Sequence, residues 1–208
     1  IRFTLAKRDT NCNTSTGITR ANAGSIYPLY KTSGVNYLGS SGVPESNIKA
    51  ISTWNQGMYY NIWIVNKIDG DGTSSAPTRA FAQAPADYYD PLDGLVILAN
   101  EINSFTSTPA STISYDEVIH VLGHAFNLLD VYDPSPNSSG CPPSTNCAST
   151  GDRVCDTEPM ISSNGGCSSG TNSCTGSAYG TTPHNFMNNS SCRSLFTPGQ
   201  RTRMLYTM

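Results

Sequence analysis

Two histidines four residues apart are the side chains of this sequence best suited to chemistry. His120 and His124 lie in the segment H-V-L-G-H-A-F-N-L-L-D, residues 120–130. On an α-helix this spacing places both imidazoles on one face, one turn apart, where they can hold a single zinc ion. In the pattern H-E-x-x-H, the glutamate after the first histidine is the general base for a zinc-bound water. Val121 occupies that position and can neither accept nor release a proton.

The helix that must carry these histidines has a clear predicted start. Ser114 and Glu117 form a capping box, which satisfies the first backbone N–H groups of a helix. Glu117 lies one turn before His120 on the same face, and we interpret it as a cap rather than as a replacement base. The alternative for the histidine pair is that both are core residues of a buried helix. The apolar face of the predicted helix comprises Val118, Ile119, Leu122, Ala125 and Phe126.

Short apolar runs bounded by Gly, Pro and Asn predict strands in the first half of the chain. Residues 1–5 and 78–84 alternate, residues 60–65 are rich in β-formers, and residues 95–98 form the continuous apolar run of a buried strand. Residues 44–57 allow a short helix. A final helix is predicted from Pro198 onward, capped by Thr197. The order predicts an α/β half followed by an irregular half.

Six of the seven cysteines fall within the last third of the chain, in loops rich in Ser, Gly, Asn and Pro. Zinc ribbons need close C-x-x-C pairs, and the sequence has none. We therefore favour disulfides over a cysteine–zinc site, which implies an oxidising compartment. Because the number is odd, one thiol is free or pairs outside the chain, and Cys12 is the candidate.

Composition excludes two classes of partner. The formal net charge is −3 and only 13% of the residues are charged, so a nucleic-acid partner has no electrostatic basis. The longest apolar run is about five residues, far short of the roughly 18 that a membrane span needs. At 208 residues the chain forms one domain or two closely packed subdomains.

Spaced motifs across nearly the whole chain resemble the pappalysin family of metzincin zinc endopeptidases, in particular its secreted bacterial members. In chain order these motifs are I-R-F-T-L-A at 1–6 with R-D at 8–9, G-I-T-R at 17–20, Y-N-I-W at 60–63, G-D-R-V-C-D-T at 151–157, H-N-F-M-N at 184–188 and F-T-P-G-Q at 196–200. The resemblance implies a metzincin-like zincin fold of class α/β. A twisted mixed sheet and the active-site helix would make an N-terminal subdomain, residues 1–126. An irregular, disulfide-tied C-terminal subdomain with the Met-turn and the terminal helix would follow, residues 127–208.

The departures from the family pattern fall where the chemistry should be. The extended family motif is H-E-x-x-H-x-x-G-x-x-H, so the resemblance implies His120, His124 and Asp130 as zinc ligands, with Asp130 in place of the third histidine. Asn127 replaces a glycine that ends the helix in a left-handed turn, which asparagine also tolerates. Asn189 replaces the tyrosine that relatives use to stabilise the tetrahedral intermediate. Asn189, like Val121, is therefore a degenerate catalytic position.

The resemblance assigns structural roles to residues further along the chain. Met187 becomes the Met-turn methionine beneath the site, and His184 supports its loop rather than binding metal. It also implies a disulfide between Cys167 and Cys192, and one between Cys174 and either Cys141 or Cys147.

The 151–157 segment resembles the loop associated with structural calcium in relatives. Asp152, Asp156 and Thr157 offer hard oxygen ligands suited to calcium. An equal alternative is a loop whose aspartates cap their own backbone.

The sequence thus predicts a secreted, metalloprotease-like protein whose catalytic residues are lost. As a pseudoprotease it would bind a protein or peptide partner, or serve as a structural module, outside the cell or at its surface. The rival is an active zinc endopeptidase with a His-His-Asp site; relatives cleave peptide bonds, some after basic residues. The family's first strand and backing helix have no counterpart here. Either the chain was cut, or a second chain supplies the strand, because a missing internal strand leaves backbone groups unpaired.

Overall fold

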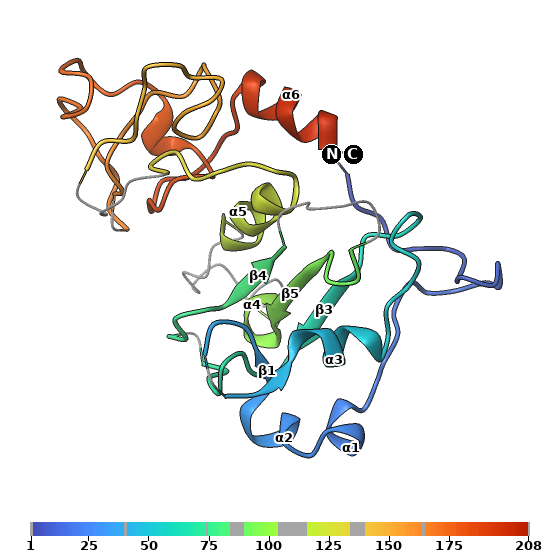
Figure 1. Cartoon of the computed structure of the whole chain (residues 1–208). Helices are drawn as coiled ribbons and strands as arrows, with labels where there is room; N and C mark the ends of the chain where they lie inside the picture. Colours follow the sequence, from blue (N-terminus) through green and yellow to red (C-terminus); the bar gives the residue numbers. More distant parts are fainter. Residues whose placement is uncertain are drawn as a thin grey trace. The chain divides into compact units, whose positions relative to one another are not determined.

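The computed structural model describes residues 2–39, 41–73, 75–83, 90–103, 116–133, 140–163 and 165–207. The chain forms two compact units, Ile1–Ile113 and Ser114–Met208 (Figure 1). The first unit carries the strands and four short helices, and the second carries the histidine helix, long irregular loops and the terminal helix. The α/β class and the mixed sheet predicted from the sequence are confirmed.

A three-stranded mixed sheet organises the first unit. Strands β3 (Ile62–Val65), β4 (Ala80–Ala82) and β5 (Leu95–Leu98) lie in the order β3-β5-β4 (Figure 1). β5 pairs parallel with β3 and antiparallel with β4, and all four of its residues are buried. A central strand covered on both faces needs apolar side chains at every position, which explains the unbroken run L-V-I-L. The strands predicted at 60–65, 78–84 and 95–98 are thus confirmed, although the first two are shorter.

A second, two-stranded parallel sheet joins β1 (Val35–Asn36) to β2 (Val43–Pro44). Short helices α1 (Ala23–Ile26), α2 (Tyr30–Ser33) and α3 (Glu45–Ala50) adjoin these strands, and α4 (Ala99–Asn103) follows β5. Helix α3 buries Lys49, whose ammonium group pairs with Glu45 and lies 5.0 Å from the centre of the Trp63 ring. The core of the unit includes Val35, Ile48, Trp63, Phe81, Val96 and Leu98.

The strand predicted at residues 1–5 is wrong. The described part of this segment is not in a strand, and Phe3 and Leu5 are 45% and 61% exposed. An alternating pattern becomes a strand only when a neighbour accepts and donates along its backbone. Here Phe3 instead packs on Tyr60, with 5.6 Å between ring centroids.

The second unit contains α5 (Asp116–Ala125), a 3₁₀ turn η1 (Thr182–His184) and α6 (Pro198–Thr207). The predicted cap of α6 is confirmed, because the Gln200 backbone N–H donates to the Thr197 hydroxyl at 3.1 Å. Ser114, the predicted cap of the histidine helix, lies outside the described residues. The core of the unit comprises Leu128, Val131, Met160, Met187 and Met204.

Three disulfides tie the loops of this unit: Cys141–Cys174, Cys147–Cys155 and Cys167–Cys192. The predicted pairings of Cys167 and Cys174 are confirmed, as is the preference for disulfides over a zinc ribbon. Cys12 is exposed and free, as predicted. In the described part of the chain, no helix has both the length and the apolarity to cross a membrane.

The division between the compact units lies before α5, whereas the predicted subdomain boundary at 126/127 lies after it. Contacts with the Met-turn explain the difference. The His120 ring reaches the Phe186 carbonyl at 2.7 Å, and Gly123 lies against Met187. The boundary at 126/127 remains a prediction about the family's subdomains.

Candidate metal centre

The middle of α5 is held against the Met-turn by a close contact between Gly123 and Met187. A Cβ atom at Gly123 would lie 2.3 Å from the Met187 sulfur, so a larger residue there would require the Met187 side chain to shift. Met187 itself is fully buried. Gly123 lies between the two histidines in the sequence, so this contact sets the distance of both histidines from the Met-turn. Met187 thus lies beneath the histidine helix, as the resemblance predicts.

Each histidine is oriented by a backbone carbonyl. The Nδ1 atom of His120 lies 2.7 Å from the Phe186 oxygen, and Nδ1 of His124 lies 3.0 Å from the Leu128 oxygen. A carbonyl oxygen can only accept, so in both rings Nδ1 carries the proton and donates it. The remaining Nε2 atom of each neutral imidazole then presents a lone pair. This is the state in which histidine binds a metal.

The two lone pairs converge on one carboxylate. The Nε2 atoms are 3.1 Å apart, and the Asp130 Oδ1 atom lies 3.3 Å from His120 Nε2 and 3.5 Å from His124 Nε2. Among the described residues this oxygen has no hydrogen-bond donor, although it is buried. Three acceptors that face one another repel unless a cation lies among them. The arrangement therefore fits a divalent metal held by His120, His124 and Asp130, the three predicted ligands.

Burial acts against a positive charge on His120. It lowers the pKa of that imidazole, and this outweighs the opposite effect of the Asp130 carboxylate.

Asp130 reaches the histidines because the chain reverses directly after α5. Asn127 adopts a φ of +66°, the left-handed conformation predicted for it. The Leu128 N–H donates back to the Gly123 carbonyl at 2.9 Å, and the Val131 N–H donates to the Met187 carbonyl at 3.0 Å. The predicted substitution of asparagine for glycine is therefore compatible with the turn.

Val121 and Asn189, which occupy the family's catalytic positions, lie in different surroundings. The Val121 side chain is apolar and buried, with 5% of its surface exposed. Asn189 is exposed, and its backbone carbonyl accepts a hydrogen bond from the Gly165 N–H at 2.9 Å. Glu117, one turn before His120, forms an ion pair with Arg193 at 3.6 Å.

The site also contains a residue that sequence reasoning missed. This residue is Tyr132: burial raises the pKa of its hydroxyl, and the negative charge of the nearby Asp130 carboxylate raises it further. Its position two residues after Asp130 was the only sequence signal. Burial and the same carboxylate also raise the pKa of Asp133.

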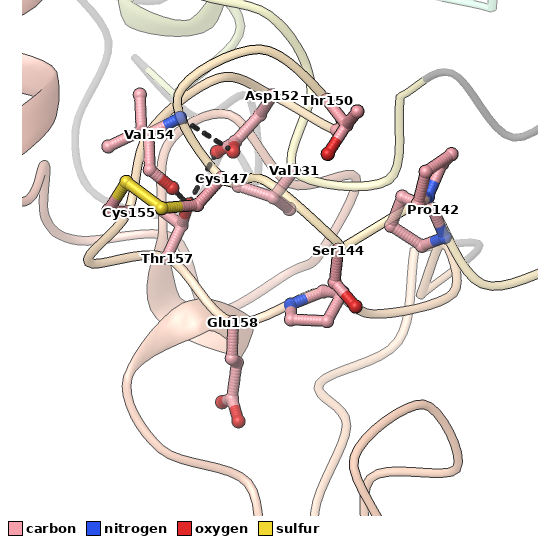
Figure 2. A pocket seen from close by; sticks show the side chains of 13 residues that line it. Val131, Pro142, Ser144, Cys147, Thr150, Asp152, Val154, Cys155, Thr157 and Glu158 are labelled. Carbon is pink, nitrogen blue, oxygen red and sulfur yellow. Dashed lines mark hydrogen bonds between the residues drawn. A yellow bond between two sulfur atoms is a disulfide. The ribbon is translucent and has the colours of Figure 1, made fainter.

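The proposed calcium residues have other partners in the structure. Asp152 accepts hydrogen bonds from the Thr157 hydroxyl at 2.7 Å and from the Val154 N–H at 3.1 Å (Figure 2). Asp156 accepts from the Thr197 hydroxyl at 2.7 Å and from the Gly199 N–H at 2.8 Å. The structure thus brings Asp152 and Thr157 together, while Asp156 caps α6. Asp152 and Thr157 line one wall of a pocket of about 220 Å³ (Figure 2).

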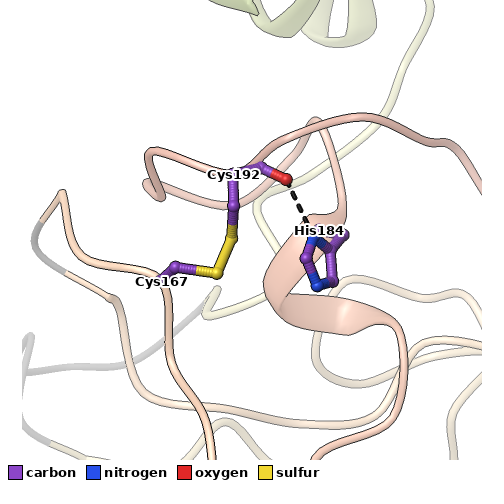
Figure 3. A group of neighbouring side chains, drawn as sticks. All are labelled: Cys167, His184 and Cys192. Carbon is purple, nitrogen blue, oxygen red and sulfur yellow. Dashed lines mark hydrogen bonds between the residues drawn. A yellow bond between two sulfur atoms is a disulfide. The ribbon is translucent and has the colours of Figure 1, made fainter.

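A second group of metal-type ligands is already used by a covalent bond. Cys167, His184 and Cys192 lie together, but the two sulfurs form a disulfide (Figure 3). The His184 Nδ1 atom lies 2.9 Å from the Cys192 carbonyl, and the His184 carbonyl accepts the Ser194 and Leu195 N–H groups at 2.7 and 3.1 Å. His184 thus supports its loop, as predicted.

The sequence matches the family profile described as pregnancy-associated plasma protein-A over residues 42–208. Among curated proteins, it is 31% identical over 151 residues to an extracellular metalloprotease of Podospora anserina, which covers 69% of this chain and 45% of that protein. It is 32% identical over 150 residues to an extracellular metalloprotease of Neurospora crassa, covering 69% and 46%. The chain spans about half the length of the curated relatives it matches.

Solved structures similar to this chain are those of mirolysin. Mature mirolysin of Tannerella forsythia in complex with a cleaved peptide aligns with a TM-score of 0.64 at 24% identity, covering 96% of this chain and 67% of that one. Mirolysin in complex with compound 9 aligns with a TM-score of 0.67 at 26% identity, with the same coverage. The first likeness concerns the fold alone.

Proposed function

The chain belongs to the pappalysin family, the family of pregnancy-associated plasma protein-A, and we propose that it is a metal-binding member that no longer catalyses hydrolysis. It is an extracellular metalloprotease-family protein, a location compatible with its three disulfides. In the proposal, the former active site serves as a rigid, metal-stabilised core, and the protein acts by binding a partner or by building an assembly.

The proposed ion is zinc, which the family uses. His120, His124 and Asp130 would hold it through the three converging acceptors, and the Phe186 and Leu128 carbonyls keep the imidazole lone pairs aimed at it. Bound zinc would supply a Lewis acid with a coordination position beyond its three protein ligands. Asp130 brings a negative charge where the family has a neutral histidine, which weakens the polarisation of a bound water.

Val121 is the observation that carries the proposal of a silent site. It lies on α5 directly after the first ligand, where the family places its general base, and its side chain is buried and apolar. Loss of a general base reduces rates by about 10²–10⁴-fold, and loss of an oxyanion donor by about another 10²–10³-fold. Asn189, at the position of the family's oxyanion donor, is too short to replace a tyrosine hydroxyl at the same reach. The two losses act on one reaction.

The proposed partner is a protein or peptide, and the edge of the sheet supports one way of binding it. β3 is an edge strand in the described part of the sheet, and Ile62 and Ile64 are 45% and 57% exposed on one of its faces. An added strand could extend the sheet along β3, supplied by a second chain or by another copy. Ile64→Lys should then lower the self-association or partner binding measured by sedimentation, and an unchanged result would count against this edge.

The rival function is an active zinc endopeptidase with a non-standard base. Glu117 favours this rival, because its carboxylate lies one turn before His120 and its negative charge acts to raise the His120 pKa. Its ion pair with Arg193 argues for a structural role instead. If the rival holds, Glu117→Gln will abolish cleavage of an unfolded protein substrate by the parent chain.

Zinc content and proteolysis together test the proposal. Protein purified without added metal or chelator should contain about one zinc per chain by elemental analysis, and His124→Ala should contain none. The parent should not cleave unfolded casein, whereas Val121→Glu should gain cleavage that a chelator removes. Cleavage by the parent that His124→Ala abolishes would overturn the silent-site proposal in favour of the endopeptidase. A parent without zinc would overturn the metal site.

Calcium at Asp152, Asp156 and Thr157 remains a proposal with an alternative of equal standing. The hydrogen bonds of both carboxylates support the alternative, in which the aspartates cap backbone and side-chain donors. Isothermal titration with calcium decides between them: a saturable heat that Asp156→Ala removes would support the ion.

A further inference from the structure

The terminal helix α6 is hydrogen-bonded to the turn after α5 through one side chain, that of Arg203. The Arg203 Nε donates to the backbone oxygen of Asn127, and its Nη2 donates to the Asn127 side-chain oxygen at 3.1 Å. The planar guanidinium thus spans two acceptors of the same residue. Arginine presents its donors in such a fork, whereas lysine offers a single point charge.

Asn127 lies between two of the proposed metal ligands, His124 and Asp130, and its conformation sets their relative position. Its φ of +66° reverses the chain, and Asp130 follows three residues later. The Asn127 N–H donates to the His124 carbonyl at 2.9 Å. The next residue, Leu128, supplies the carbonyl that orients the His124 ring. Arg203 therefore fixes Asn127, which is hydrogen-bonded to the backbone of His124 and precedes Asp130 by three residues.

The helix that carries Arg203 is itself firmly anchored. Gln200 is fully buried and exchanges two hydrogen bonds with the Asn185 amide, at 2.8 and 3.0 Å. Asn185 in turn accepts the Met187 N–H at 2.8 Å. Met204 is buried in the core of the unit. The hydrogen bonds of Gln200 and Asn185 thus fix α6 relative to the Met-turn. Because Arg203 lies on α6, its bonds to Asn127 fix the turn after α5 relative to the Met-turn as well.

We propose that Arg203 is a positioning residue of the metal centre: by clamping Asn127 it aims the Asp130 carboxylate and the Leu128 carbonyl at the histidines. This inference rests on the proposed metal binding. Arg203 touches none of the ligand atoms, and its effect passes through the turn. Loss of the clamp leaves the helix end with two unpartnered acceptors and frees the chain between His124 and Asp130.

Metal affinity provides the first test. Zinc affinity is measured by competition with a chelator for the parent, Arg203→Met and Arg201→Met, the last being an exposed arginine on the same helix. Residues that support metal ligands typically change affinity by about 10–100-fold, so Arg203→Met should bind zinc about 10-fold more weakly. Arg201→Met should equal the parent. Arg203→Lys, which keeps charge and length but not the fork, should fall between them and covers the case in which Arg203→Met does not fold.

Amide hydrogen exchange in the presence of a chelator tests the clamp without metal. The Asn127 and Leu128 N–H groups, which bond back to His124 and Gly123, should exchange at least about tenfold faster in Arg203→Met than in Arg201→Met. Equal protection in both variants, or equal zinc affinity while the parent binds zinc, would overturn the role of Arg203. A parent that binds no zinc would instead overturn the proposed function, and the metal part of this inference with it.

Discussion

Two parts of the second unit offer oxygen and nitrogen ligands, and they differ in whether those atoms already have partners. At the histidine helix, the two imidazole Nε2 atoms and the Asp130 Oδ1 atom face one another at 3.1–3.5 Å, while both Nδ1 atoms lie against backbone carbonyls. In the 151–157 loop, Asp152 and Asp156 each accept two hydrogen bonds from nearby donors. The first arrangement fits a bound cation, whereas the carboxylates of the second already accept hydrogen bonds from the protein.

The contrast teaches that residue types alone do not define an ion site. Both segments contain carboxylates next to other possible ligand atoms, which are imidazole nitrogens in the first and a threonine hydroxyl in the second. What separates them is the supply of donors. Two threonine hydroxyls, one N–H group in the loop and one N–H group at the start of α6 donate to the loop aspartates. The Nδ1 protons of the histidines are drawn away to carbonyls, which leaves only acceptors facing Asp130.

The largest effect is expected when a carboxylate is removed from each segment in turn. Asp130→Ala deletes a proposed metal ligand and should weaken zinc binding by more than the roughly 100-fold that supporting residues reach. Asp152→Ala should leave zinc affinity within a few-fold of the parent. Chelator competition measures both. Equal losses in the two variants would mean that the loop contributes to the same ion site, and the contrast would fail.

A packing change should affect the histidine helix and spare the loop. Gly123→Ala places a methyl group 2.3 Å from the Met187 sulfur, so it should lower the free energy of unfolding by about 1–3 kcal/mol and weaken zinc binding. Gly166→Ala is the control, because its added Cβ meets only the Ser163 oxygen, at 3.3 Å. Urea denaturation monitors both variants. A stable Gly123→Ala protein would show that Met187 can move aside.

Removing Asp156 should cost stability without changing zinc affinity. Asp156→Ala leaves the Thr197 hydroxyl and the Gly199 N–H without their acceptor at the start of α6, and loss of such a cap lowers the unfolding free energy by about 0.5–2 kcal/mol. Calcium should raise the melting temperature of neither the parent nor this variant. A calcium-dependent rise confined to the parent would make the loop a calcium site and reverse the comparison.

The smallest expected effect is a pH dependence that belongs to the loop. Burial raises the pKa of Asp152 above its ordinary value of 3.8, despite the hydrogen bond from Thr157. A carboxyl group whose pKa is raised by folding favours the folded state at low pH, and this contribution is lost as the pH rises through the folded pKa. The stability of the parent relative to Asp152→Asn should therefore decrease from about pH 3 to neutral pH. Denaturation at several pH values measures it, and an increase over that range would contradict the assigned cause.

Much of the local structure was predictable because it depends on neighbours in the sequence. The buried run at 95–98 and the cap at Thr197 are set by side-chain type and spacing, the left-handed Asn127 was implied by the family resemblance, and each is confirmed. The segment at 1–5 failed because alternation states a preference for an extended chain and does not supply a pairing strand. The clamp between Arg203 and Asn127 was not predictable, since 76 positions separate the two residues.

The sequence alone determined the ligand types, the four-residue spacing of the histidines and the absence of a proton-transfer group at Val121, because these follow from residue identity and helix geometry. It also determined that one cysteine must remain outside the intrachain disulfides. Only the tertiary structure decided which ring nitrogen of each histidine is bare, since the carbonyl that orients His120 lies 66 residues away. It likewise decided that, among the described residues, the Asp130 Oδ1 atom has no hydrogen-bond donor, while Asp152 and Asp156 each accept two hydrogen bonds. A hydrogen-bond partner is a matter of position in space, and folding alone brings distant donors and acceptors together.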